Sequence, residues 1–224
     1  MDPVHRRAWV EDALPGYASG PGAPVRATAE ALSKVDGATV AVLVEGVSDQ
    51  IAVETAAAVC DHDLQAKRVV VVPIGGAHAI GRFLESLGPR GAGLRLAGLC
   101  DDNEAELFRR ALVRSGVGAP RTRDDLQRLG FFVCERDLEE ELIRAVGAAR
   151  TQALLGVHGD LGAFRSFQSQ PAWREREPEQ QLRRFLGSGA SRKLRYAQLL
   201  TEAAARQDAL PRPLAALLAA VTGA

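Results

Sequence analysis

The chain has 224 residues, and its 28 lysines and arginines balance 28 aspartates and glutamates, so the formal net charge is zero. A neutral chain has no global basic field for nucleic acid, although a local basic patch stays open. Hydrophobic residues make up 46% of the sequence, which is ordinary for a soluble globular protein and enough for a sizeable core. The sequence shows no pattern of a signal peptide, no apolar run near the ~18 residues of a membrane helix, and no disulfide framework or zinc motif among its three cysteines. These features predict a reduced, cytoplasmic location without membrane attachment.

The first predicted elements are a lead-in, a helix and a buried strand. Residues 1–24 are rich in Pro, Gly and Ala and predict a loosely ordered lead-in, and residues 25–35 have the apolar spacing of one helix. The apolar run Thr39–Val44 predicts a strand buried on both faces of a parallel sheet. Ser48 is a good N-cap for the helix that follows. Glu45 is therefore expected at the carboxyl end of a central strand, where open α/β sheets place their chemistry.

Three further strands alternate with helices along the chain. The predicted strands span residues 67–74, 94–100 and 131–134, and the predicted helices span residues 77–87, 104–114, 124–129 and 138–146. Such alternation indicates βαβ units. The sequence therefore predicts an α/β fold, with a four-stranded, mostly parallel sheet flanked by helices.

Beyond Gly147 the pattern changes to helices alone. The predicted helices span residues 151–155, 161–167, 179–186, 191–206 and 213–221. We place a boundary near residues 147–149. It divides the chain into a lead-in (1–24), an α/β domain (25–147) and an all-helical C-terminal subdomain (148–224).

Acidic side chains follow three of the predicted strands. Glu45 and Asp49 follow the first strand, Asp101 follows the third, and Asp137 and Glu139 follow the fourth. Because the carboxyl ends of parallel strands lie along one edge, these groups should converge. Converging carboxylates repel unless a cation neutralises them or some stay protonated, and oxygen ligands suit Mg²⁺ or Mn²⁺. The chemistry expected of such a site is phosphoryl transfer or phosphodiester hydrolysis.

A structural explanation of these acids stands beside the functional one. Asp49 serves equally well as a helix cap, and Glu139 and Glu140, taken singly, fit a solvated first helical turn better than a site. Glu45 lies too far before the helix for a cap. The occurrence of acids at three strand ends together favours the metal site.

The segment Glu45–Asp49 after one apolar strand, with Asp101–Glu104 after another, resembles the TOPRIM domain. That domain is shared by primases, topoisomerases, recombination-repair proteins and the overcoming-lysogenization-defect (OLD) nucleases. Because Asp137-Leu138-Glu139 follows the fourth strand, the closest likeness is to the TOPRIM half of the OLD nucleases, over residues 38–146. The resemblance implies an endonuclease that depends on Mg²⁺ or Mn²⁺ and hydrolyses DNA.

The resemblance also implies roles for individual residues. Glu45 corresponds to the family's metal ligand or general acid/base, and Asp49 to the aspartate four residues later. The family's Asp-x-Asp pair falls on Asp101 and on position 103, which is Asn103 here. A sharp turn would let a neighbouring acid replace the missing carboxylate. The expected metal ligands are Glu45, Asp49, Asp101, Asp102, Glu104, Asp137 and Glu139. Asn103 also leaves open a degenerate, non-catalytic module that binds nucleic acid or an ATPase partner.

The most concentrated basic region lies near the C-terminus. It comprises Arg183, Arg184, Arg192, Lys193 and Arg195, and aromatic side chains are interleaved with it. On DNA these cations would neutralise phosphates and make the affinity salt-dependent, whereas a solvated helix face is the slightly favoured alternative. Lys193 is similar to the lysine that the family's nucleases keep for the transition-state charge, so we place it with Glu45 among the catalytic candidates.

One feature of the OLD nucleases is missing from the sequence. Their ATPase half would need a Gly-x-x-x-x-Gly-Lys-Ser/Thr segment, and none occurs. Any ATP dependence would then come from a partner chain. The expected partners are DNA and a separate ATPase subunit, with a homodimer as a further option.

Overall fold

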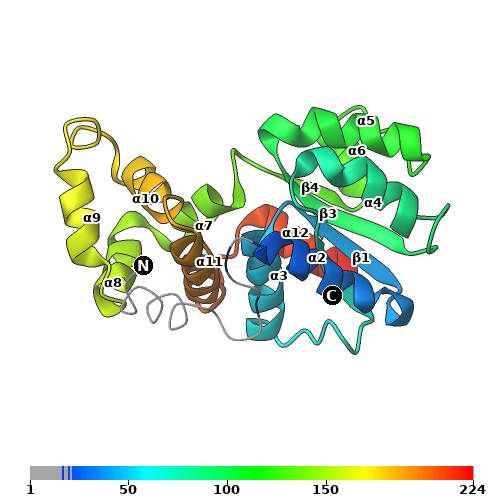
Figure 1. Cartoon of the computed structure of the whole chain (residues 1–224), viewed down its shortest axis with the longest axis horizontal. Coiled ribbons are helices and arrows are strands. Elements are labelled where there is room, and N and C mark those ends of the chain that lie inside the picture. Colours follow the sequence, from blue (N-terminus) through cyan, green and yellow to red (C-terminus); the bar gives the residue numbers. More distant parts are fainter. Residues whose placement is uncertain (1–16, 18–19, 21, 224) are drawn as a thin grey trace.

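The structure is a computed structural model that describes residues 17, 20 and 22–223. Four strands form one sheet in the order β2-β1-β3-β4 (Figure 1). The strands are β1 (Val40–Val44), β2 (Val69–Pro73), β3 (Arg95–Asp101) and β4 (Phe131–Cys134). Every neighbouring pair runs parallel. The predicted fold class, an α/β protein with a four-stranded parallel sheet, is confirmed.

The central strand β1 lies between β2 and β3 and is buried along its whole length. Val42 lies opposite Val71 of β2 on one side and Ala97 of β3 on the other. At Gly98 a Cβ would lie 2.5 Å from the Leu43 carbonyl oxygen, so this position of β3 requires glycine. The register therefore brings the ends of β1 and β3 side by side.

Helices cover one face of the sheet with an apolar stripe each. They are α2 (Ala23–Ser33), α4 (Ile80–Leu87), α5 (Ala105–Ser115) and α6 (Arg123–Arg128). Three short 3₁₀ helices, η1 (Val35–Gly37), η2 (Ala77–Ala79) and η3 (Asp102–Glu104), join these elements to the strands. On this face Phe108 of α5 is fully buried and meets Phe131 of β4 edge-on.

The opposite face is covered by α3 and by helices from the C-terminal part of the chain. They are α3 (Val47–Val59), α7 (Leu138–Val146), α11 (Ala190–Ala205) and α12 (Arg212–Thr222). The α12 helix packs on β3 and β4, and α11 packs on α3 and α7. The remaining helices, α8 (Ala148–Val157), α9 (Leu161–Gln168) and α10 (Pro178–Leu186), form a lobe beside the sheet (Figure 1).

One hydrophobic core runs from Val40 of β1 to Val221 of α12 and therefore crosses the predicted boundary at residues 147–149. The division into an α/β domain and a helical subdomain stays a prediction, but the core does not divide there. None of the helices in the described residues has the length and the apolar character of a membrane span. The predicted lead-in, residues 1–24, lies mostly outside the described residues, and its last two residues belong to α2.

Two predictions of local structure need correction. The N-cap of α3 is Gly46 rather than Ser48, which is buried within the first turn. The reason is that the Asp49 carboxylate accepts a hydrogen bond from the Gly46 backbone N–H at 3.0 Å, so an acid at the third helical position does the capping. The helix expected at residues 151–155 is also longer and spans Ala148–Val157.

Candidate metal centre

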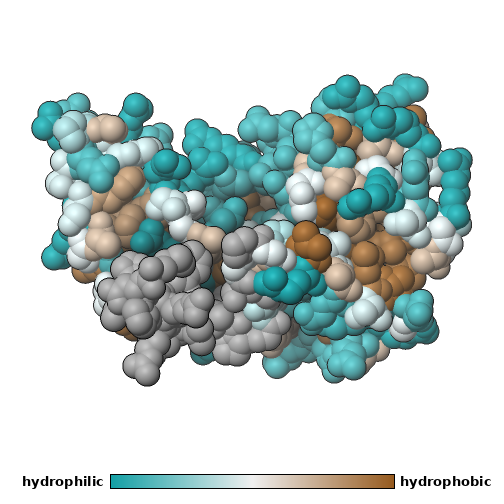
Figure 2. Space-filling view, in the orientation of Figure 1, coloured by the Kyte–Doolittle hydropathy of each residue, from teal (hydrophilic) through white to brown (hydrophobic). Residues whose placement is uncertain are grey.

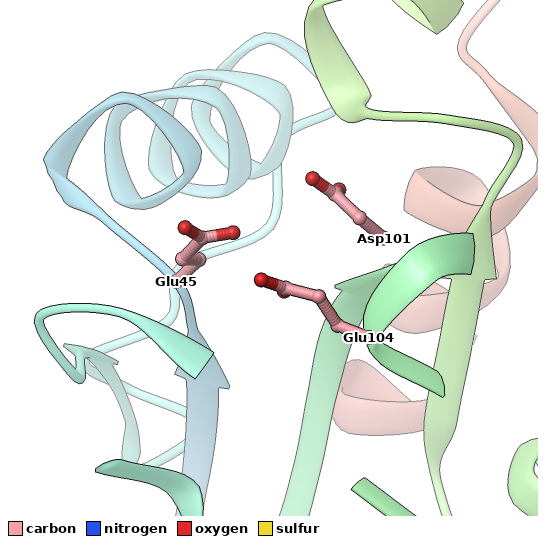
Figure 3. Close-up of side chains that lie close together, drawn as sticks. All are labelled: Glu45, Asp101 and Glu104. Atoms are coloured by element: carbon pink, nitrogen blue, oxygen red, sulfur yellow. The ribbon is translucent and has the colours of Figure 1, made fainter. Parts of the chain in front are cut away.

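Three carboxylates meet at the edge of the sheet where the strands end. Glu45 follows β1, Asp101 is the last residue of β3, and Glu104 closes η3. One carboxylate oxygen from each residue lies within 4.8 Å of the others. Figure 3 shows the three side chains pointing toward one another across the gap between the two strands. We call Glu45, Asp101 and Glu104 the carboxylate trio.

The backbone explains how three acids from two segments come together. Because β1 and β3 are parallel neighbours, Glu45 and Asp101 emerge at the same edge. The 3₁₀ turn of η3 then carries the chain round sharply, so that Glu104 faces back toward Glu45. Asn103 is exposed in this turn. Glu104 thus supplies a third carboxylate where the sequence pattern lacks one at position 103.

The electrostatics of the trio are those of acids without a counter-ion. Burial, followed by repulsion from Asp49, Asp137 and Glu45, raises the pKa of Asp101 to about 8. Burial, followed by the interaction with Glu45, raises the pKa of Glu104 to about 7. The Glu104 Oε2 atom is buried and has no hydrogen-bond partner. An orphaned acceptor beside two further carboxylates fits a divalent cation, which would supply the missing positive charge.

Asp49 fills both of the roles that the sequence left open. It caps α3 through the Gly46 N–H, and it also lines the groove that contains Glu45 and Asp101. Burial raises its pKa to about 6, although Lys193 and the Gly46 hydrogen bond act in the opposite direction. It lies outside the trio's 4.8 Å cluster.

The groove has a volume of about 360 Å³, and its other wall comes from α7 and α11. Asp137 and Glu139, both expected as metal ligands, line this wall together with Lys193. The Asp137 side chain caps α7 by accepting the Glu140 N–H at 2.8 Å, and it also pairs with Arg183. Glu139 Oε1 lies 3.0 Å from Lys193 Nζ. The acids of this wall therefore already have cationic partners.

Lys193 and Asp102 are placed differently with respect to the groove. Burial alone would lower the pKa of Lys193, but Glu139, Asp49 and Asp137 outweigh it and the net shift is upward. Lys193 thus stays an ammonium group inside the groove. Asp102 pairs with Arg123 and has a half-exposed side chain, so it does not join the trio.

The other predicted DNA-binding cations are largely paired with acids. Arg183 Nε donates to Asp137 at 2.7 Å. Arg192 lies 4.0 Å above the Phe185 ring, and its Nε is 3.7 Å from Asp160. Arg195 is 3.6 Å from the same Asp160, whereas Arg184 is exposed.

Asp160 is a residue of this region that no sequence motif indicates. It lies just before α9, accepts the Tyr196 hydroxyl at 2.9 Å and faces two arginines of α11. The interaction spans more than thirty positions of sequence, so no local spacing could reveal it. The DNA-binding role of the region stays a prediction, and its positive charge is smaller than its sequence indicates.

The segment that contains β1, β2 and β3 is similar to a known protein family. Residues 38–102 match the family model described as the overcoming lysogenization defect protein-like TOPRIM domain. The resemblance to the OLD-like TOPRIM domain is confirmed. The matched segment runs from the start of β1 to the first residue of η3 and includes Glu45, Asp49 and Asp101.

Two solved structures share the fold over most of the chain. The C-terminal region of the OLD protein of Xanthomonas campestris pv. campestris is 23% identical, with a TM-score of 0.59 over 83% of this chain and 95% of that one. The C-terminal region of the Burkholderia pseudomallei OLD protein is 22% identical, with a TM-score of 0.59 over 82% and 96% of the two chains. No curated protein sequence matches the chain. The likeness includes the C-terminal helices, which the TOPRIM segment alone does not reach.

Proposed function

We propose that this protein is a Mg²⁺- or Mn²⁺-dependent nuclease that hydrolyses DNA phosphodiester bonds. The observation that carries the proposal is the carboxylate trio, with one oxygen from each residue within 4.8 Å of the others and a buried Glu104 oxygen that lacks a partner. The OLD-like TOPRIM similarity supports it, because the resemblance implies this activity.

Glu45, Asp101 and Glu104 are the residues that would hold the ion, and Asp49 lies beside them in the groove. A bound divalent cation supplies a Lewis acid for a phosphate oxygen and an activated water. The chain's own part is to hold three carboxylates ready at one edge of a buried sheet, where β1 and β3 leave little freedom to move apart. The remaining expected ligands, Asp102, Asp137 and Glu139, would act at most around the ion, because each has a cationic partner.

Lys193 would act on the substrate rather than on the metal. Its ammonium group faces the groove from the opposite wall, and Glu139 holds it there at 3.0 Å. Negative charge grows on the phosphoryl oxygens as the phosphodiester bond breaks, and a fixed cation that stays protonated stabilises it. In this scheme Glu139 is a positioning residue for Lys193.

The second candidate function is a non-catalytic module that binds nucleic acid or a separate ATPase subunit. Asn103 favours this function, because a neutral residue stands where the family's pattern has a carboxylate. Glu104 now provides a carboxylate close to Glu45 and Asp101, so the structural reason for a degenerate site is weaker. The ATPase partner and the homodimer remain predictions from the sequence.

Calorimetry with Mg²⁺ and Mn²⁺, followed by plasmid cleavage, tests the proposal. The wild-type protein should bind the ion and nick DNA, while Glu45→Gln and Glu104→Gln should weaken both together. Glu179→Gln, an exposed acid in the first turn of α10, is the matched control and should change neither. Absence of divalent-ion binding by the folded wild-type protein would refute the nuclease and favour the module.

A further inference from the structure

A second basic region lies on α5, on α6 and on the segment that joins them. Residues 105–128 contain six arginines but three acids, although the whole chain is neutral. The arginines are Arg109, Arg110, Arg114, Arg121, Arg123 and Arg128. We call these six residues the arginine surface. All but the half-buried Arg109 are exposed.

The arginine surface keeps a net positive charge because its acids are too few to pair with every cation. Glu106 is shared between Arg109 at 2.8 Å and Arg110 at 3.6 Å. Arg123 pairs with Asp102, and Arg128 pairs with Asp125. Neither of the other two members, Arg114 and Arg121, forms an ion pair with another described residue. The α10–α11 region differs, because there most cations are matched by acids.

A shallow groove of about 270 Å³ runs through this surface. It is lined by Arg109, Arg110, Val113, Arg114 and Pro120. Arg109 Nε donates to the Pro120 carbonyl oxygen at 3.2 Å, so one guanidinium is held at the wall of the groove. Val113 is 54% exposed and gives the groove an apolar patch among the cations. Figure 2 shows mainly hydrophilic residues over α5, with a few hydrophobic groups among them.

The arginine surface begins beside the carboxylate trio and extends away from it along α5. Helix α5 begins directly after Glu104, and Arg123 pairs with Asp102 in the same turn as Glu104. With a rise of 1.5 Å per residue, Arg114 lies about 15 Å along the helix from Glu104. One DNA strand carries a phosphate roughly every 3.4 Å along the axis, so the helix spans about four nucleotides.

We propose that the arginine surface binds the phosphate backbone of the DNA that enters the groove of the carboxylate trio. Guanidinium groups match phosphate geometry, and Arg114 and Arg121 have positive charge that no acid of the described residues neutralises. The identity of the ligand as DNA rests on the proposed nuclease function. Binding itself requires no catalysis and can be measured without a divalent ion.

Fluorescence anisotropy of a labelled DNA duplex in EDTA tests the proposal across a series of salt concentrations. Arg114→Gln with Arg121→Gln should weaken binding by roughly tenfold and lower the slope of log K against log salt by about 2, at about 0.9 per lost contact. The double lysine variant at the same positions should keep most of the affinity, since it keeps the charge. Arg150→Gln with Arg165→Gln, two exposed arginines of α8 and α9, is the matched control and should leave the slope unchanged.

Equal affinity of the Arg114/Arg121 double variant and the wild-type protein would overturn the proposal, and an acidic protein partner would then explain the surface better. Failure of the wild-type protein to bind DNA at low salt would overturn it as well. Failure of the nuclease proposal appears separately, as the absence of Mg²⁺ binding in calorimetry. If the protein binds DNA through Arg114 and Arg121 but binds no divalent ion, the nuclease proposal is wrong and the DNA-binding role of the arginine surface is supported.

Discussion

The two walls of the groove, one at the ends of β1 and β3 and the other from α7 and α11, both contain acids but differ in how those acids are neutralised. On the β1–β3 side, Asp101 lines the groove and has a strongly raised pKa, as does Glu104, which belongs to the trio but not to the groove lining. On the α7 wall, Asp137 pairs with Arg183 and Glu139 pairs with Lys193. The first wall is electrostatically incomplete, whereas the second is neutralised within the chain.

The presence or absence of a cationic partner thus distinguishes carboxylates suited to bind a metal ion from carboxylates that stabilise the fold. Acids that repel one another cost stability unless an ion binds, so their convergence points to a ligand. Acids with an arginine or lysine partner are already neutralised within the chain, so their position does not indicate a ligand. The sequence alone placed both groups in one metal site, because strand ends reveal where a carboxylate lies but not which cation it meets.

The sharpest test compares one acid from each wall. Asp101→Asn should weaken Mg²⁺ binding by at least about 100-fold, because it removes a ligand and not only a supporting group. Asp137→Asn should keep the ion affinity within a few-fold, since an asparagine still caps α7. Calorimetry measures both values. If the two variants lose affinity equally, the walls do not differ in the way described.

The cation of the α7 wall gives the next largest effect. Lys193→Ala should reduce DNA cleavage by about 100-fold, a typical loss for one group that stabilises transition-state charge, while the ion affinity persists. Plasmid nicking at saturating Mg²⁺ measures the loss. Arg150→Ala serves as the control, because that arginine is exposed on α8 and lies outside the groove lining. An unchanged rate in Lys193→Ala would assign the lysine to structure alone.

The raised pKa of Asp101 should also make the stability of the metal-free protein depend on pH. The pKa of Asp101 is raised from 3.8 to about 8, so the folded state binds its proton more tightly than the unfolded state does. The free energy of unfolding in EDTA should therefore decrease as the pH rises from about 4 to about 8. A loss of about 1 kcal/mol would lower the melting temperature by roughly 2–4 °C in a chain of this size.

Asp101→Asn removes the main titrating group and should flatten this pH profile, as should saturating Mg²⁺ in the wild-type protein. Thermal melts in EDTA at several pH values measure the effect. A melting temperature that rises steadily over this range, in the wild-type protein without metal, would contradict the assignment.

Substitution of Asp137, on the wall formed by α7, should lower the stability of the protein and not its metal binding. Asp137→Ala removes the N-cap of α7 and leaves Arg183 without its main partner, so the free energy of unfolding should fall by about 1–2 kcal/mol. Urea denaturation measures this loss. The Asp137→Asn variant should recover most of it through capping, and a similar loss in both variants would mean that the arginine pair dominates.

The strands could be read from the sequence because each is a short apolar run followed by polar residues. The apolar run Thr39–Val44 predicts the strand that the structure has at Val40–Val44, and the fourth predicted strand matches Phe131–Cys134. A parallel sheet then fixes the edge at which Glu45 and Asp101 emerge. The start of α3 was misplaced, because Asp49 reaches back to cap Gly46 while Ser48 is buried.

The pairing of charges could not be read from the sequence. Glu104 joins the trio only because η3 turns the chain within a few residues, and this turn compensates for the neutral side chain of Asn103. Asp160 meets Arg192 and Arg195 across a packed helical lobe. The arginines between residues 105 and 128 have the pattern of an ordinary helix and linker, yet Arg109, Arg110 and Arg114 line one groove.

The sequence by itself determined the parallel sheet and the rim on which Glu45 and Asp101 stand, because apolar periodicity and strand direction are local properties. Tertiary structure alone decided which charges are neutralised. An ion pair depends on two side chains that the fold brings within a few ångströms, whatever their separation along the chain.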